Sequence, residues 1–235
     1  MGGITGWFRW AKTLSILLPI IVFSVIRIAN YENKTGKFWE IFKKPWTMWF
    51  LYGILFLNIM EATIKDYSTG NIFNALCGFL LCVTIPFPLK FWKVSKEKHG
   101  DLVAYTTMFW NFAYTTWNLC FVFGESKEYF ASSVCILLAA EIYPIIMKRP
   151  ELYITARVYT LAAHLLIRAC APGLFPAVMN AASWQNPIVL KYWGIANVII
   201  IIPYAFWHMW QLETGKSDVS FTRGRVEELE DKVAV

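Results

Sequence analysis

Residues 109–121 have the sequence FWNFAYTTWNLCF, an aromatic and apolar stretch without a charged side chain. The stretch lies within a longer uncharged run, Leu102–Gly124. The hydrocarbon core of a bilayer is about 30 Å thick, and a helix needs roughly 20 apolar residues to cross it. The run is therefore long and apolar enough to predict a membrane-spanning helix.

Similar runs recur along the 235 residues, of which 57% are hydrophobic and only 16% are charged. A soluble domain of this length needs more charged side chains to cover its surface. We therefore expect an all-α, polytopic membrane protein in which residues 1–212 form one domain of seven transmembrane helices and 213–235 form a polar cytoplasmic tail. The expected helices cover residues 12–30, 45–64, 72–92, 102–123, 128–147, 151–171 and 187–211.

Lysine and arginine gather in segments 31–44, 90–98, 148–149 and 213–235. If the seven helices alternate in direction, these four segments lie on the same side of the membrane. Basic loops stay on the cytoplasmic side, so the N-terminus is expected outside and the C-terminus inside. The plasma membrane is the expected location. The net charge of +6 is then an orientation signal, and we expect no nucleic-acid partner.

The five cysteines all lie within predicted helices and form no Cys-x-x-Cys motif, which favours small apolar packing residues over disulfides. The three histidines are too far apart in sequence to form a metal site on one helix. No His-Glu-x-x-His or Gly-x-Ser-x-Gly motif is present. We therefore expect no metal or other cofactor, and the sequence favours a protein that is not an enzyme.

The predicted helix 102–123 carries two kinds of side chain at helical spacing. Asn111 and Asn118 lie seven residues apart and share a polar stripe, and Tyr114 and Trp117 belong to an aromatic stripe beside it. Amides that fix orientation next to rings that cover an apolar surface suit a site for a flat or polar solute. The alternative is that the asparagines hydrogen-bond neighbouring helices while the tryptophans pack between them.

The predicted helix 151–171 has Arg157, His164 and Arg168 on a single face. Charged side chains at bilayer depth are costly, so this face is expected to point away from lipid. Glu141 precedes the turn near Arg149 by about as many residues as Arg157 follows it. A tight hairpin would bring Glu141 and Arg157 to the same depth, and we expect an ion pair there that fixes the packing or acts as an inner gate.

Matching residues by depth brings further polar side chains together from four predicted helices. A structural staple needs only two groups, so this larger set predicts a hydrated pocket that opens outward. His164 could couple the pocket to protons if it titrates there. The predicted ligand-binding residues are Asn58, Glu61, Asn111, Tyr114, Trp117, Asn118, His164, Arg168 and Asn197.

These features favour a membrane transporter or permease that takes a small polar or aromatic solute into the pocket. Two alternatives stay open: a receptor or sensor that binds the solute without moving it, and a membrane enzyme that acts on lipid head groups with His164 as general base. The expected partners are the solute and membrane lipids, and self-association into a homo-oligomer is left open.

The pairs Trp110-Asn111 and Trp117-Asn118 resemble the tryptophan-and-asparagine motifs of nicotinamide-riboside permeases, which have a similar length and helix number. Only these four residues carry the resemblance, which implies a permease that takes a flat, polar solute. Microbial rhodopsins hold retinal on a lysine in the middle of the membrane. The last predicted helix has only Lys191, near its outer end. Retinal binding is therefore not expected.

Overall fold

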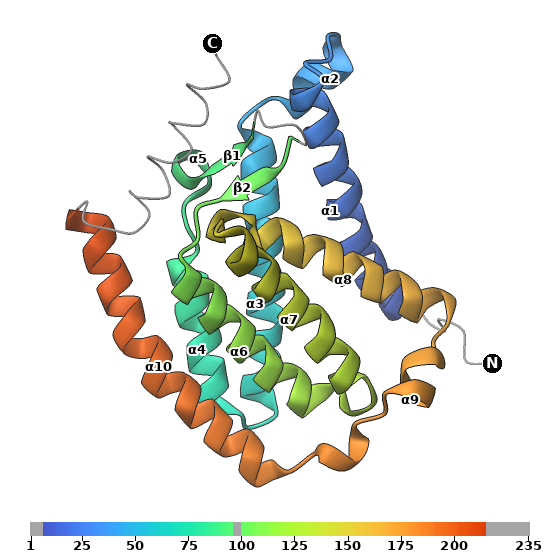
Figure 1. Ribbon diagram of the computed structural model, residues 1–235, viewed down its shortest axis with the longest axis vertical. Helices are drawn as coiled ribbons and strands as arrows, with labels where there is room; N and C mark the ends of the chain where they lie inside the picture. The colour runs from blue at the N-terminus through green and yellow to red at the C-terminus, as the bar shows by residue number, and fades with distance from the viewer. Residues whose placement is uncertain (1–6, 96–99, 215–235) are drawn as a thin grey trace.

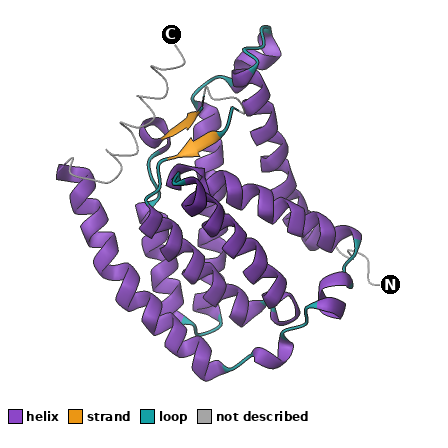
Figure 2. Cartoon of the chain, viewed as in Figure 1, coloured by secondary structure: helices purple, strands orange, loops and turns teal. Residues whose placement is uncertain are grey.

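The computed structural model describes residues 7–95 and 100–214, and most of these are helical. The helices are α1 (Trp7–Tyr31), α2 (Lys37–Phe42), α3 (Trp46–Ser68), α4 (Ile72–Thr84), α5 (Pro88–Phe91), α6 (Met108–Glu125), α7 (Phe130–Met147), α8 (Tyr153–Cys170), α9 (Leu174–Val178) and α10 (Pro187–Thr214). Short 3-10 turns, η1 to η3, lie at Lys127–Tyr129, Pro150–Leu152 and Ala182–Trp184. Two strands, β1 (Trp92–Val94) and β2 (Leu102–Ala104), complete the described fold (Figures 1 and 2).

The seven expected helices correspond to α1, α3, α4, α6, α7, α8 and α10. Helices α4, α6, α7 and α8 are shorter than expected, α4 and α6 the most, since α6 begins at Met108 instead of residue 102. Helix α4 ends at Thr84 instead of continuing to residue 92. Pro86 and Pro88 follow, and proline both lacks an amide hydrogen and disfavours helical geometry in the residue before it. The predicted tail lies, from residue 215 onward, outside the described residues.

Three helical segments are long and apolar enough to cross a membrane: Trp46–Ser68, Lys127–Met147 and Pro187–His208. Two shorter apolar helices are Leu17–Tyr31 and Ile72–Thr84. These segments support association with a membrane and agree with the all-α class apart from the two short strands.

Helix α4 lies at the centre of one half of the bundle and packs against α3, α6 and α10. Helix α7 packs between α6 and α8, and α8 runs across α1 in the view of Figure 1. Large side chains such as Trp110, Trp117, Leu81 and Tyr153 fill the core between these helices. The chain thus forms two groups of helices, α3–α4–α6–α10 and α6–α7–α8, which share α6.

Strands β1 and β2 form an antiparallel hairpin in which Trp92 pairs with Ala104, where the sequence predicted a loop followed by the start of a helix. Arg27 of α1 holds this hairpin through an ion pair with Asp101 (3.1 Å) and a hydrogen bond from Nε to the carbonyl of Gly100 (3.1 Å). Arg27 also donates to the hydroxyl of Tyr159. One side chain therefore links α1, the hairpin and α8.

The turn between α7 and α8 is tight, as the sequence predicted. Lys148 adopts a left-handed conformation (φ 55°), and the amide of Arg149 donates to the carbonyl of Pro144 at 2.9 Å, which closes the end of α7. Arg149 then pairs with the buried carboxylate of Glu151 at 2.9 Å. Helices α7 and α8 pack against each other after this turn.

Candidate functional site

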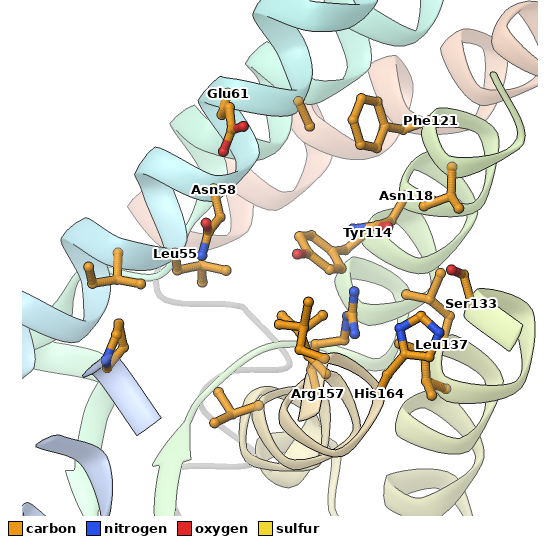
Figure 3. Close-up of a pocket in the computed structure, with 18 of the residues that line it drawn as sticks. Leu55, Asn58, Glu61, Tyr114, Asn118, Phe121, Ser133, Leu137, Arg157 and His164 are labelled. Carbon is orange, nitrogen blue, oxygen red and sulfur yellow. The ribbon is translucent and has the colours of Figure 1, made fainter. Parts of the chain in front are cut away.

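A cavity of about 550 Å³ lies between α1, α3, α6, α7 and α8. Most of its wall is aliphatic, contributed for example by Leu55 of α3, Leu137 of α7, and Leu161 and Leu165 of α8. Figure 3 shows the polar side chains that interrupt this wall: Asn58 and Glu61 on the α3 side, Tyr114 and Asn118 from α6, and Arg157 and His164 on the α8 side. The cavity therefore offers both apolar surface and polar groups that converge from three helices.

Helical spacing explains how these groups reach the same cavity. Asn58 and Glu61 lie one turn apart on α3, and Tyr114 and Asn118 lie one turn apart on α6. Within the described chain, Asn58 and Asn118 make no hydrogen bond, so their amide groups are available to a solute or to water. Six of the predicted ligand-binding residues line the cavity: Asn58, Glu61, Tyr114, Asn118, His164 and Arg168.

His164 is buried and engaged by its neighbours. Its Nε2 lies 2.9 Å from the hydroxyl of Ser132, and its ring lies against that of Phe175, with 4.7 Å between the ring centroids. The Ser132 hydroxyl donates to the carbonyl of Tyr129 at 3.0 Å, so it accepts from a protonated Nε2. In this arrangement His164 does not take the Ser132 proton, and the pair does not form a nucleophile with its base.

The two arginines on this face of α8 make different contacts. The Arg168 guanidinium lies over the ring of Tyr129, with 3.8 Å between its central carbon and the ring centroid, which is cation–π geometry. Arg157 also lines the cavity, but its Nε and Nη1 atoms are buried and meet no acceptor among residues 7–95 and 100–214. Arg157 is thus a half-buried cation whose hydrogen-bonding capacity is not fully used.

The predicted ion pair between Glu141 and Arg157 does not form. The Glu141 carboxylate accepts a hydrogen bond from Thr115 of α6 at 2.8 Å, and the Thr115 hydroxyl lies 2.7 Å from that of Tyr153. Tyr153 precedes Arg157 by one turn of α8. The prediction of matched depth was therefore close, but Glu141 faces α6 while Arg157 faces the cavity.

Trp117 and Asn197, which were predicted to bind the solute, belong to a separate buried cluster and do not line the cavity. Trp117 is 0% exposed, and its indole nitrogen donates to the carbonyl of Asn74 at 3.0 Å. Asn197 donates to the side-chain oxygen of Asn74 at 2.9 Å and accepts from Thr116 at 2.9 Å. This corresponds to the alternative interpretation, in which amides join neighbouring helices.

The centre of this cluster is Asp66, which is only 3% exposed. Its two carboxylate oxygens accept hydrogen bonds from Asn71 (3.0 Å) and Asn74 (2.6 Å). Asn74 also donates to the carbonyl of Trp117 at 3.2 Å. We call the set the amide network; it consists of Asp66, Asn71, Asn74, Thr116, Trp117 and Asn197.

Asn111 lies in neither region. Its Nδ2 donates to the carbonyl of Pro150 at 3.0 Å, which fastens the turn between α7 and α8 to α6. Its buried Oδ1 has no partner within the described residues. Its place at the start of α6 explains the difference from Asn118, because the two lie about two turns apart along the helix axis.

Sequence reasoning missed the amide network because it did not consider Asn74 and Asp66. Asn74 lies in the first turn of an apolar helix, and the rule that a polar side chain in a membrane helix needs a partner would have marked it. Ser133, which also lines the cavity, carried no comparable signal because serine packs readily between helices.

Comparison with protein-family models, with curated proteins and with solved structures finds no match to this chain. The likeness of the two Trp-Asn pairs to nicotinamide-riboside permeases is therefore a likeness of four residues.

Proposed function

We propose that this chain is a membrane transporter that binds a small solute in the cavity between α1, α3, α6, α7 and α8 and carries it across the membrane. The observation that supports the proposal is the cavity of about 550 Å³, with polar side chains from α3, α6 and α8 on a mostly apolar wall. Sites for small molecules are typically about 300–1,000 Å³, largely apolar, and equipped with a few polar groups that set orientation.

Asn58 and Asn118 are the groups proposed to orient the solute. They lie on different helices, line the same cavity and make no hydrogen bond within the described chain. Tyr114 takes the stacking role that the sequence assigned to Trp117, because its ring lines the cavity. Glu61 and Arg168 also line the cavity and contribute charge to its wall.

The membrane topology belongs to the same proposal. Helices α1, α3, α4, α6, α7, α8 and α10 cross the plasma membrane, with the N-terminus outside and the cytoplasmic tail inside. The 13 residues of α4 extend only about 20 Å at 1.5 Å per residue, so α4 crosses together with the segment that leads to α5. The basic segments on one side support this orientation.

The proposal is tested with the purified full-length chain. Small carboxylates, amines and nucleosides are screened by thermal shift, and each hit is offered in radiolabelled form to proteoliposomes. We expect saturable uptake that is lost in Asn118→Ala and kept in Asn180→Ala, an exposed asparagine that is not among the cavity-lining residues. Binding without uptake would contradict transport and favour a sensor, and a chemically altered solute would favour an enzyme.

A further inference from the structure

We propose that the cavity selects an anionic amphiphile, whose carboxylate or phosphate group pairs with the guanidinium of Arg157 and whose apolar part lies on the aliphatic wall. The inference rests on the proposed binding of a solute in this cavity, and it does not require that the solute be transported.

The charge of Arg157 is the first feature that points to an anionic ligand. A guanidinium stays protonated at any physiological pH, so Arg157 keeps its charge although it is half-buried. Its Nε and Nη1 atoms are buried and donate to no acceptor within the described chain. A partly buried charge without a counter-ion is unfavourable, and perturbed charges of this kind cluster at functional sites. Because Arg157 lines the cavity, an anion bound there would supply the missing opposite charge.

Neither Glu141 nor Glu61 pairs with Arg157. The Glu141 carboxylate accepts a hydrogen bond from Thr115 instead. Glu61 lies on the α3 side of the cavity, opposite Arg157 in Figure 3. Among the described residues, no ion pair involves Arg157. The guanidinium thus has no counter-ion within the described chain, and a carboxylate or phosphate in the cavity can pair with it.

The wall around Arg157 defines the rest of the ligand. Val158, Leu161 and Leu165 continue along α8 from Arg157, and Ile54 and Leu55 contribute from α3. An inorganic anion would leave this apolar surface uncovered, whereas a molecule with an alkyl or ring portion would cover it and gain hydrophobic stabilisation. The combination of the Arg157 guanidinium and a long, mostly apolar wall favours an amphiphile over a simple ion.

The experiment uses the full-length chain in phosphatidylcholine nanodiscs and measures binding of octanoate by calorimetry. Octanol keeps the tail without the charge, and acetate keeps the charge without the tail. We expect octanoate to bind at least tenfold more tightly than either control. Arg157→Gln should weaken octanoate binding at least tenfold, whereas Lys191→Gln, which removes one exposed positive charge on α10, should change it less than twofold.

A second arm separates the two sources of such a ligand. Oleate placed in the nanodisc bilayer presents the same carboxylate from the membrane, and octanoate presents it from water. Competition by oleate assigns the site to a membrane amphiphile, and octanoate binding without competition assigns it to a soluble acid. Both results uphold the pairing with Arg157.

The melting temperature of the ligand-free protein shows whether the Arg157→Gln variant is folded. Removing a half-buried charge that has no counter-ion should raise the melting temperature of Arg157→Gln above that of the wild type in the absence of ligand. A lower melting temperature would show that Arg157 holds the fold together. Unchanged octanoate binding in Arg157→Gln, equal binding of octanol, or no binding of either octanoate or oleate would each overturn the proposal.

These outcomes are distinct from failure of the proposed transport. Binding at Arg157 without flux would uphold the anion site and remove transport. Saturable flux of an uncharged solute that is insensitive to Arg157→Gln would uphold transport and contradict the anion site.

Discussion

The cavity and the amide network contain similar side chains in different physical states. In the amide network, Asp66, Asn74 and Asn197 satisfy one another through hydrogen bonds between α3, α4 and α10. In the cavity, Asn58 and Asn118 make no hydrogen bond within the described chain, and Arg157 keeps buried atoms without an acceptor. Polar residues within long apolar helices are therefore not by themselves evidence for a site. The informative feature is whether their hydrogen bonds are completed by the protein.

Helix α6 contributes to both regions because adjacent residues point in different directions. Tyr114 and Asn118 line the cavity, whereas Thr116 and Trp117 face α4 and α10. Successive residues of an α-helix are rotated by about 100°, so two neighbours in sequence do not share a face. The Trp117-Asn118 pair is therefore divided between a packed interface and an open cavity.

The largest effect is expected for Asn74→Ala, in the amide network. The change removes a donor to Asp66 and a partner of Asn197, so that buried polar groups lose their hydrogen bonds. We expect a loss of about 3 kcal/mol in the free energy of unfolding. Unfolding in increasing dodecyl sulfate measures it, and a loss below about 1 kcal/mol would show that the network contributes little.

Gly78→Ala tests how closely the amide network is packed. A methyl group at this position would collide with the hydroxyl of Thr63 and lie 2.8 Å from the indole nitrogen of Trp117. Overpacking of a core costs about 1–3 kcal/mol. The control is Gly53→Ala, because nothing lies within 4 Å of its added methyl group. Equal melting temperatures for the two variants would contradict close packing at Gly78.

Glu141→Gln tests whether Glu141 and Arg157 form an ion pair. A glutamine oxygen can still accept the hydrogen bond from Thr115, and no bond to Arg157 is lost. We therefore expect a change of less than about 1 kcal/mol, whereas breaking a buried ion pair costs about 3–5 kcal/mol. A loss in the larger range, measured by the same unfolding assay, would restore the pair between Glu141 and Arg157.

The smallest effect on stability is expected for Asn118→Leu, in the cavity. Because Asn118 has no hydrogen bond within the described chain, its replacement should change the free energy of unfolding by no more than about 0.5 kcal/mol. Binding of the cavity ligand, measured by calorimetry, should nevertheless weaken at least tenfold. Intact binding would exclude Asn118 from the site even if stability behaves as expected.

The sequence predicted the positions of the main helices because uncharged runs of membrane length leave few alternatives. It overestimated α4, since Pro86 and Pro88 lie within an apolar run that hydropathy alone does not divide. Six of the residues that it assigned to a binding site line the cavity: Asn58, Glu61, Asn118, His164 and Arg168 by their depth, and Tyr114 by its place in an aromatic stripe. It could not separate Trp117 and Asn197 from them, because rotation about each helix axis and the position of Asn74 are set by packing between helices.

Cysteine accessibility tests the central claim, that the cavity is hydrated whereas the amide network is dry, most directly. The two exposed cysteines, Cys135 and Cys170, are replaced by alanine, and Asn118→Cys is added. The native Cys120, buried beside Asn71, serves as the control next to the amide network. The account predicts that a water-soluble methanethiosulfonate labels position 118 rapidly and leaves Cys120 unmodified. Equal protection of both thiols, or faster labelling of Cys120, would contradict it.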